Sequence, residues 1–181
     1  MTPPGPPRSR PLEGAHWRTV AHFDAAVPDD WHERLCARLG QRPRRLGRWA
    51  ELALYGARCC LDAAGEETLP AGASLCVASL RGPMMAIRAA LAEQAERGAP
   101  MPFTFLQTQP SQMLAALCQQ LRWGGDARFV LSRDTAALLR LTQLEAGPDG
   151  LLFGQVDEGE GPTSRWWRMH PQTPPRGSSA G

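Results

Sequence analysis

Short apolar runs alternate with longer segments of helical apolar spacing from residue 74 onward, and this alternation constrains the fold more than any other feature. Residues 74–80 are small and nearly all apolar, and Gly72 and Gly82-Pro83 bound them, which is typical of a buried strand. Further strands are predicted at 128–132 and 151–156, with helices between them. This order predicts an α/β domain in which helices cover a mixed, mostly parallel sheet.

The helices are predicted from apolar spacing and from the residues that begin or end them. The expected ranges are 31–39, 49–64, 83–97, 112–121 and 135–145. Glycine follows the first three, at Gly40, Gly65 and Gly98, and favours a helix end. Ser111 is the expected N-cap of the fourth helix. Gly56 lies inside the second helix and indicates close packing there.

The chain is expected to form one domain at residues 15–169. A leader at 1–14 and a tail at 170–181 are rich in proline and polar residues, and we expect both to be disordered. The hydrophobic fraction of 43% fits a globular protein, and no apolar run approaches the roughly 20 residues of a membrane span. The net charge of +2 is too small to indicate a nucleic-acid partner.

Side chains that bind metals or cofactors are sparse. Residues His16, His22 and His32 match no zinc spacing, so no metal site is expected. Every basic residue is arginine, which leaves no lysine to form a Schiff base, and we expect no cofactor. The five cysteines form no CxxC pair and are expected to be free thiols in the cytoplasm.

Several segments occur in an order that resembles a known family. An arginine-rich stretch at 44–48 precedes a helix that ends in Ala-Gly, and the strand at 74–80 ends in a small-residue turn with glycine. Next come Pro100-Met101-Pro102-Phe103 and, after the fourth helix, the phrase at 151–158. Together they resemble the N-terminal subdomain of β-ketoacyl synthases, of the thiolase-fold family, from Arg44 to Glu158. The resemblance implies a layered, thiolase-like half-domain.

The resemblance also implies a nucleophilic cysteine that this chain lacks. In the family, a central strand delivers the cysteine at a strand-to-helix turn. Here Ser132, Arg133 and Asp134 occupy that turn, and no cysteine follows Cys118. The two condensing histidines of such enzymes belong to a second half of the fold, and this chain is expected to lack that half. Because condensation needs a thiolate and donors for the oxyanion, no catalytic residue is expected.

The function implied by the resemblance is that of a partner subunit. The chain is similar to the shortened, cysteine-less, chain-length-factor-type subunits of aryl-polyene and type II polyketide-like systems. Such a subunit would form a heterodimer with a complete β-ketoacyl synthase. It would help to shape the acyl pocket of that enzyme in polyene or fatty-acid-like biosynthesis, without chemistry of its own.

Candidate partner-binding residues follow from the same resemblance. Arginines Arg44, Arg45 and Arg48 suit the phosphate or acidic helix of an acyl carrier protein, although they could equally be solvated or paired within the chain. The segment expected near the subunit interface contains Phe103, Phe105, Gln109 and Met113. Composition alone makes Phe103, Phe105 and Met113 ordinary core residues.

Other interpretations remain open. Ser132 could serve an acyl hydrolase or acyltransferase, although a serine N-cap for the helix at 135–145 is the favoured explanation. Asp134 is an equally good cap for that helix. The chain could also be a degenerate stand-alone binding module. Trp166-Trp167 could form a docking edge or fold back on the core. An isolated half of the fold is expected to expose a sheet edge and an apolar patch.

Overall fold

The fold is described from a computed structural model, which describes residues 17–159 and 161–172. Eleven elements follow one another along these ranges. They are β1 (Trp17–Phe23), α1 (Trp31–Leu39), α2 (Arg48–Ala64), β2 (Ser74–Ser79), α3 (Met84–Arg97), α4 (Pro102–Gln107), α5 (Pro110–Gln120), β3 (Ala127–Leu131), α6 (Thr135–Glu145), β4 (Leu151–Asp157) and β5 (Thr163–Pro171). Strand β5 runs past residue 169, whereas most of the expected leader and tail lies outside the described residues.

A single five-stranded sheet organises the domain, in the order β1-β5-β4-β2-β3. Strand β2 pairs in parallel with β3 and β4, and β5 pairs antiparallel with β4 and β1. The predicted α/β fold and mixed sheet are confirmed, although parallel pairings make up half of the total rather than most. The strand expected to be central, β3, lies at the edge of the sheet, since β2 is its only neighbour among the described strands.

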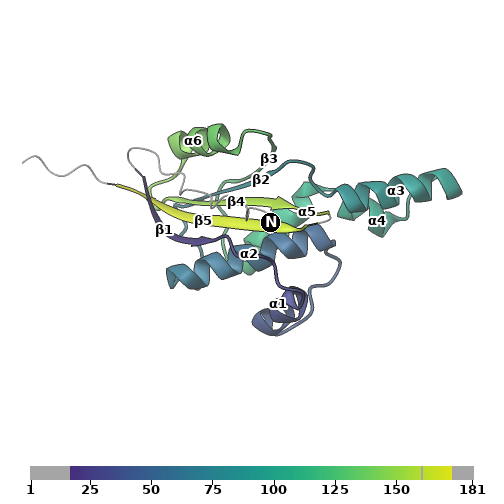
Figure 1. Cartoon of the computed structure of the whole chain (residues 1–181), viewed down its shortest axis with the longest axis horizontal. Helices are drawn as coiled ribbons and strands as arrows, with labels where there is room; N and C mark the ends of the chain where they lie inside the picture. The colour runs from purple at the N-terminus through teal and green to yellow at the C-terminus, as the bar shows by residue number, and fades with distance from the viewer. Residues whose placement is uncertain (1–16, 160, 173–181) are drawn as a thin grey trace, which may run out of the picture.

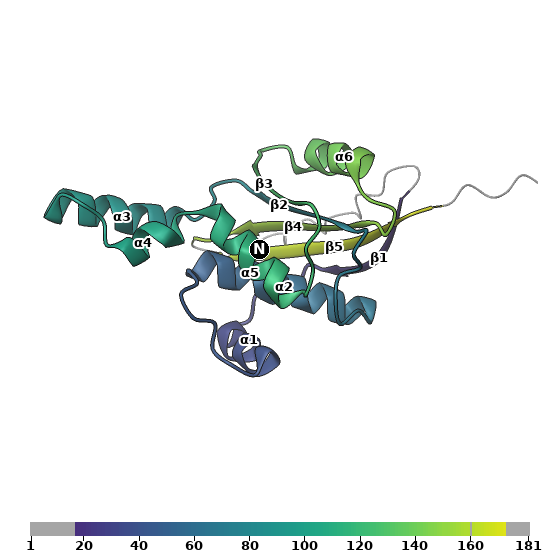
Figure 2. The same cartoon turned by 180° about the vertical axis from the view of Figure 1, so that it is seen from behind.

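Helix α2 covers one face of the sheet, with α5 and α1 beside it (Figure 1; Figure 2). Most of its residues are buried, because its apolar side chains face the sheet while Gly56 permits close approach. A Cβ on Gly56 would lie 2.5 Å from Cδ1 of Trp166 and closer still to Oγ of Ser164. The close packing predicted at Gly56 is therefore confirmed.

The opposite face of the sheet has less cover, since α6 is the one helix among the described residues that packs on it (Figure 1). Its buried cluster unites Leu139 of α6 with Phe153 of β4 and with Trp167 and Met169 of β5. Leu144 of the same helix is 85% exposed. This second buried cluster is therefore small, and the outer side of α6, which carries Leu144, does not belong to it.

Helices α3 and α4 project from the end of the sheet as an arm, which we call the α3–α4 arm (Figure 1; Figure 2). Glu93 of α3 holds the two helices together, because its carboxylate accepts hydrogen bonds from the amide of Met101 (2.7 Å) and the hydroxyl of Thr104 (2.9 Å). Ala90 is the only buried residue of α3, and α4 has none. The apolar row of α3 therefore does not reach the core, and Leu91 is 63% exposed.

Several local predictions need correction. Residues 102–107, where the sequence predicted no helix, form α4, which Pro102 begins. Helix α5 starts at Pro110, so Gln109 is its N-cap and Ser111 lies inside the helix. Strands β1 and β5 were not predicted. Both Trp166 and Trp167 are buried, which excludes a docking edge at these two side chains.

Candidate functional site: partner-binding surface and adjoining pockets

The turn between β3 and α6, which we call the elbow, is where the sequence predicted the lost nucleophile. Its serine continues the strand, since the Ser132 amide donates to the carbonyl of Ser79 (3.0 Å). The Ser132 hydroxyl donates to the carbonyl of Asp134 (3.0 Å) and accepts from its amide (3.1 Å). Asp134 caps α6 by accepting from the amide of Ala137 (2.8 Å). The helix cap is thus Asp134, and Ser132 closes a turn before it.

Among the described residues, no hydrogen bond joins the Ser132 hydroxyl to a side chain that could act as a base. The hydrogen bonds of Ser132 join it to backbone atoms. The described histidines lie on β1, α1 and β5, and not on β3 or α6, the two elements that flank the elbow. Arg133 is exposed. A guanidinium group keeps its proton in proteins and therefore cannot accept one as a base. This arrangement does not support nucleophilic chemistry at Ser132.

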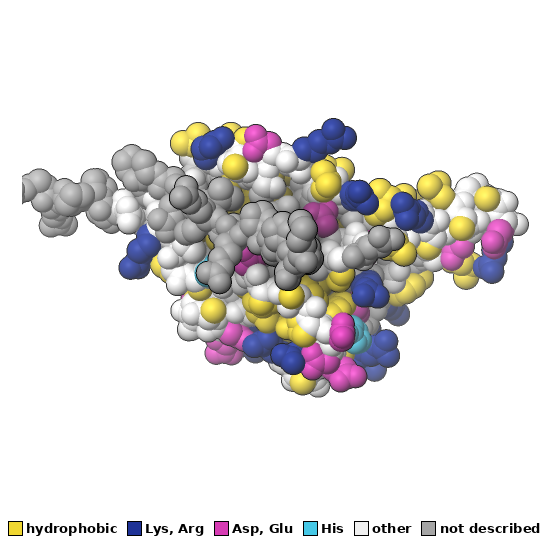
Figure 3. Space-filling model, in the orientation of Figure 1, with side chains coloured by type: hydrophobic (Ala, Val, Ile, Leu, Met, Phe, Trp, Pro, Cys, Tyr) yellow, Lys and Arg dark blue, Asp and Glu magenta, His cyan; other side chains and the backbone are white. Residues whose placement is uncertain are grey.

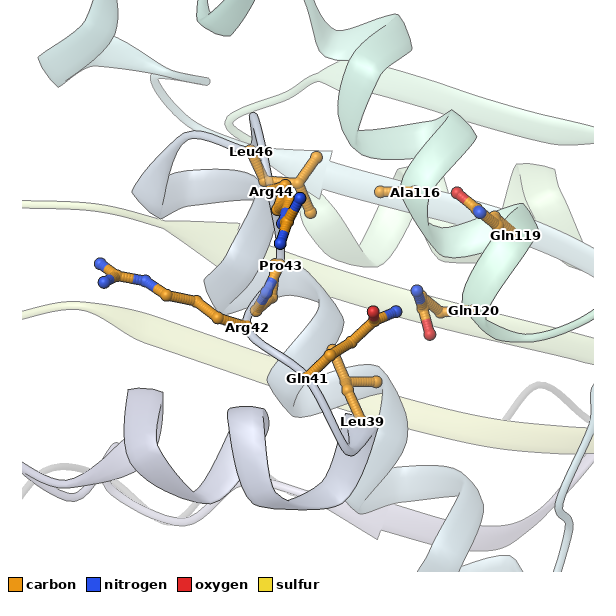
Figure 4. Close-up of a pocket in the computed structure, with 9 residues that line it drawn as sticks. All are labelled: Leu39, Gln41, Arg42, Pro43, Arg44, Leu46, Ala116, Gln119 and Gln120. Carbon is orange, nitrogen blue, oxygen red and sulfur yellow. The ribbon is translucent and has the colours of Figure 1, made fainter.

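Two of the three predicted arginines, Arg44 and Arg48, line different pockets. Arg44 lines a small pocket of about 240 Å³ between the α1–α2 linker and α5, where the amides of Gln41 and Gln120 point inward (Figure 4). Arg45 adopts a left-handed backbone conformation with φ of 64°. Arg48 begins α2 and lines a different, larger cavity. These three arginines therefore do not form one binding site.

The residues predicted near a subunit interface also separate. Phe103 and Phe105 lie on α4 and are 45% and 51% exposed. The assignment of these two residues to the core from composition is therefore wrong. Gln109 is the N-cap residue of α5, and its side-chain amide donates to the hydroxyl of Thr108 (2.9 Å). Met113 is 1% exposed and packs in the main core. Of these four predicted residues, the two phenylalanines are the ones that offer a partner substantial apolar surface.

Exposed apolar side chains gather on and beside the arm. Figure 3 shows yellow side chains along the projecting helices. Those exposed on the arm and the loops that adjoin it are Leu80, Met85, Leu91, Met101, Phe103, Phe105 and Leu106, and Leu131, Leu141 and Leu144 are exposed on β3 and α6. Such a concentration marks an interaction surface more often than it occurs on a free monomer. Exposed apolar side chains are thus present as expected, and the partner expected to cover them stays a prediction.

The larger cavity lies where the arm joins the body and has a volume of about 880 Å³. Its lining is Arg48, Arg81, Met85, Arg88, Glu158, Gly159 and Pro162. Burial raises the pKa of the Glu158 carboxyl, and the hydrogen bond from the Met85 amide and the charge of Arg48 act against that rise. Only Arg48 of this lining was singled out from the sequence. The others lie on segments that become neighbours only in the folded chain.

Metal binding and membrane insertion find no support in the described ranges. No group of three or more histidine, cysteine, aspartate or glutamate side chains there is placed to hold a metal ion. Among the same residues, every helix is too short or too polar to cross a membrane.

Comparison with known proteins identifies solved structures with a similar fold. No protein-family model and no curated protein matches the sequence. Solved structures do match. A chain of the complex of a ketosynthase with its chain length factor from Xenorhabdus doucetiae aligns with a TM-score of 0.57 and 14% identity, over 87% of this chain and 77% of that chain. The ishigamide ketosynthase/chain length factor gives a TM-score of 0.59 and 15% identity, over 75% of this chain and 47% of that one.

The chain has a ketosynthase-like fold. The resemblance predicted from the ordered segments is thereby confirmed at the level of the fold. The chain spans less than half of the length of the ishigamide structure that it matches. The β3–α6 elbow of this fold holds Ser132, Arg133 and Asp134. That it corresponds to the cysteine-bearing turn of the family stays a prediction from the resemblance.

Proposed function

We propose that the chain is a non-catalytic, ketosynthase-like partner subunit that pairs with a complete β-ketoacyl synthase. The observation that carries the proposal is the α3–α4 arm, whose two phenylalanines are about half exposed and whose helix α4 contributes no buried residue to the core. The structural neighbours come from ketosynthase and chain length factor complexes, which supports the choice of partner. The elbow without a cysteine supports a role outside the chemistry.

The edge strand β3 offers a second means of association. It pairs with β2 along one side only, among the described strands, and its last residue Leu131 is exposed. An edge strand presents unpaired backbone donors and acceptors, which favour pairing with a strand of another chain. The proposed contact surface therefore consists of the α3–α4 arm and the free edge of β3.

The finer assignment is that the arm helps to shape the acyl pocket of the partner, in polyene or fatty-acid-like biosynthesis. Phe103 and Phe105 are the side chains proposed to reach that pocket, because they are large, rigid and accessible. An acyl carrier protein is the second proposed partner. Arg44 and Arg45 on the α1–α2 linker, with Arg48 at the start of α2, are proposed to attract its acidic surface.

The proposed location is the cytoplasm. All five cysteines, Cys36, Cys59, Cys60, Cys76 and Cys118, are free thiols, as expected from the sequence. Free thiols persist in a reducing compartment, which supports this location.

Co-expression with a complete ketosynthase tests the partnership. Size-exclusion chromatography with light scattering should show one complex whose mass is the sum of the two chains. Separate elution of the two proteins at micromolar concentration would contradict the proposal and would favour a stand-alone binding module. An acyl hydrolase or acyltransferase at Ser132 is not carried further, because the hydrogen bonds of the hydroxyl lead to the backbone.

A further inference from the structure

Three arginines from separate segments converge on the cavity where the arm meets the body. Arg48 begins α2, Arg81 follows β2, and Arg88 lies on α3. Figure 3 shows dark-blue basic side chains between the body and the arm. The cavity volume of about 880 Å³ lies within the size range of pockets that hold small molecules. Its cationic lining selects for an anion.

The cavity lies where open α/β sheets bind ligands. Strands β2 and β4 are parallel neighbours, and both end beside it, since Arg81 follows the end of β2 and Glu158 follows the end of β4. The chain leaves β2 toward β3 on one side and leaves β4 toward β5 on the other. Connections that diverge in this way open a crevice at the carboxyl ends of the strands, which is the usual ligand position.

The charges around the cavity are unequal. Among the described residues that line the cavity, three are arginines and one, Glu158, is acidic. None of the three arginines forms an ion pair with a carboxylate of the described residues, whereas Arg58, Arg165 and Arg168 elsewhere do. Their combined charge is therefore available to a ligand that carries about two negative charges.

Hydrogen bonds hold the loops of the cavity in place. The Asp157 carboxylate accepts from the Ser79 hydroxyl (2.7 Å) and from the amides of Leu80 (2.8 Å) and Arg81 (3.2 Å). The Glu158 carboxylate accepts from the amide of Met85 (2.7 Å). The backbone that carries Arg81 is thus fixed before a ligand arrives, which reduces the entropy lost on binding.

We propose that this cavity binds a small molecule that carries a phosphate group. A phosphate monoester has a charge of about −1.5 to −2 at pH 7 and three acceptor oxygens, which suits several guanidinium forks. Met85 and Pro162 add apolar surface beside the arginines, where the organic part of an ester can lie. The site uses the end of the sheet within one chain and does not depend on the proposed partnership.

Isothermal titration calorimetry of the full chain at pH 7.5 tests the site, with inorganic phosphate and phenyl phosphate as probes. Phenyl phosphate should bind more tightly than phosphate because it adds apolar contact. Arg81→Gln and Arg88→Gln should each weaken binding about tenfold, since each removes a hydrogen bond between charged groups. Arg97→Gln, at the far end of α3, is the matched control and should leave the affinity unchanged.

Two further results decide the proposal. Glu158→Gln should strengthen phosphate binding, because it removes the carboxylate while its amide oxygen can still accept from Met85. An Arg81→Gln/Arg88→Gln double variant that melts at the wild-type temperature and binds phenyl phosphate as tightly as wild type would overturn the site. Equal displacement of the probe by chloride and by sulfate at one ionic strength would also overturn it, because that result indicates general screening.

Discussion

Helix α2 lies along one face of the sheet, whereas helix α3 projects from its end, and both carry apolar side chains at helical spacing. Ten residues of α2 are buried, and one of α3 is. The difference follows from what each helix contacts, because α2 packs on β1, β4 and β5, whereas α3 packs chiefly on α4. The comparison teaches that the apolar residues of the arm contribute little to the fold and are available for another molecule.

The largest expected difference between the two regions concerns two phenylalanines. Phe153→Ala in the core should lower the free energy of unfolding by about 3–5 kcal/mol, because it leaves a cavity under Trp167. Phe105→Ala on the arm should change it by less than about 0.5 kcal/mol, since that side chain is half exposed. Urea denaturation measures both changes. Equal losses would show that the arm is part of the folded core.

The contact between α2 and β5 gives the next largest effect. Gly56→Ala places a methyl group against Ser164 and Trp166, and the forced shift should cost about 1–3 kcal/mol of unfolding free energy. The matched control is Gly124→Ala, because an added Cβ there meets no atom within 4 Å. Thermal denaturation of both variants makes the comparison. A neutral Gly56→Ala would mean that the helix stands farther from the sheet than described.

Adjacent thiols on α2 should differ in reactivity. Burial raises the pKa of the Cys60 thiol to about 12, whereas Cys59 is half buried. At pH 8 a thiol with that pKa is ionised to about one part in ten thousand, and the thiolate is the reactive form. Iodoacetamide should therefore modify Cys59 well before Cys60, as mass spectrometry of peptides can show. Equal rates in the folded chain would contradict the burial of Cys60.

The smallest expected effect is at the elbow. Ser132→Cys restores the type of nucleophile that the resemblance implies, yet no condensation should follow, because the described histidines lie on other elements. Incubation with thioester substrates and mass spectrometry of the products measures this. A carbon–carbon condensation product from the variant alone would show that the elbow retains catalytic surroundings.

The sequence predicted the elements whose apolar pattern and end signals agree. Helix α6 was predicted with its observed bounds, and α1 ends at Gly40 as expected. Strand β5 was missed because Arg168 is fully buried in it, and arginine in a strand does not indicate burial. Its charge is satisfied by Glu66, at 2.7 Å and 3.0 Å, which is far away in the sequence.

The candidate site was predicted less completely than the fold. The elbow was located, because a strand and a helix flank it on either side in the sequence. The arm was not predicted, since the spacing of Met84, Ile87 and Leu91 also fits a helix that packs on a sheet. The arginine cavity could not be predicted, because only the pairing of β2 with β4 brings Arg81 close to Glu158.

The affinity of the full chain for a complete ketosynthase tests the central claim, that the arm serves a partner. Calorimetry should compare wild type with the Phe103→Ser/Phe105→Ser variant, and with Leu141→Ser on α6 as a similarly exposed control outside the proposed contact surface. Loss of two aromatic anchors should cost at least about 2 kcal/mol, or roughly 30-fold in Kd, with no change in melting temperature. Unchanged affinity in the double variant, or no binding by wild type, would contradict the claim.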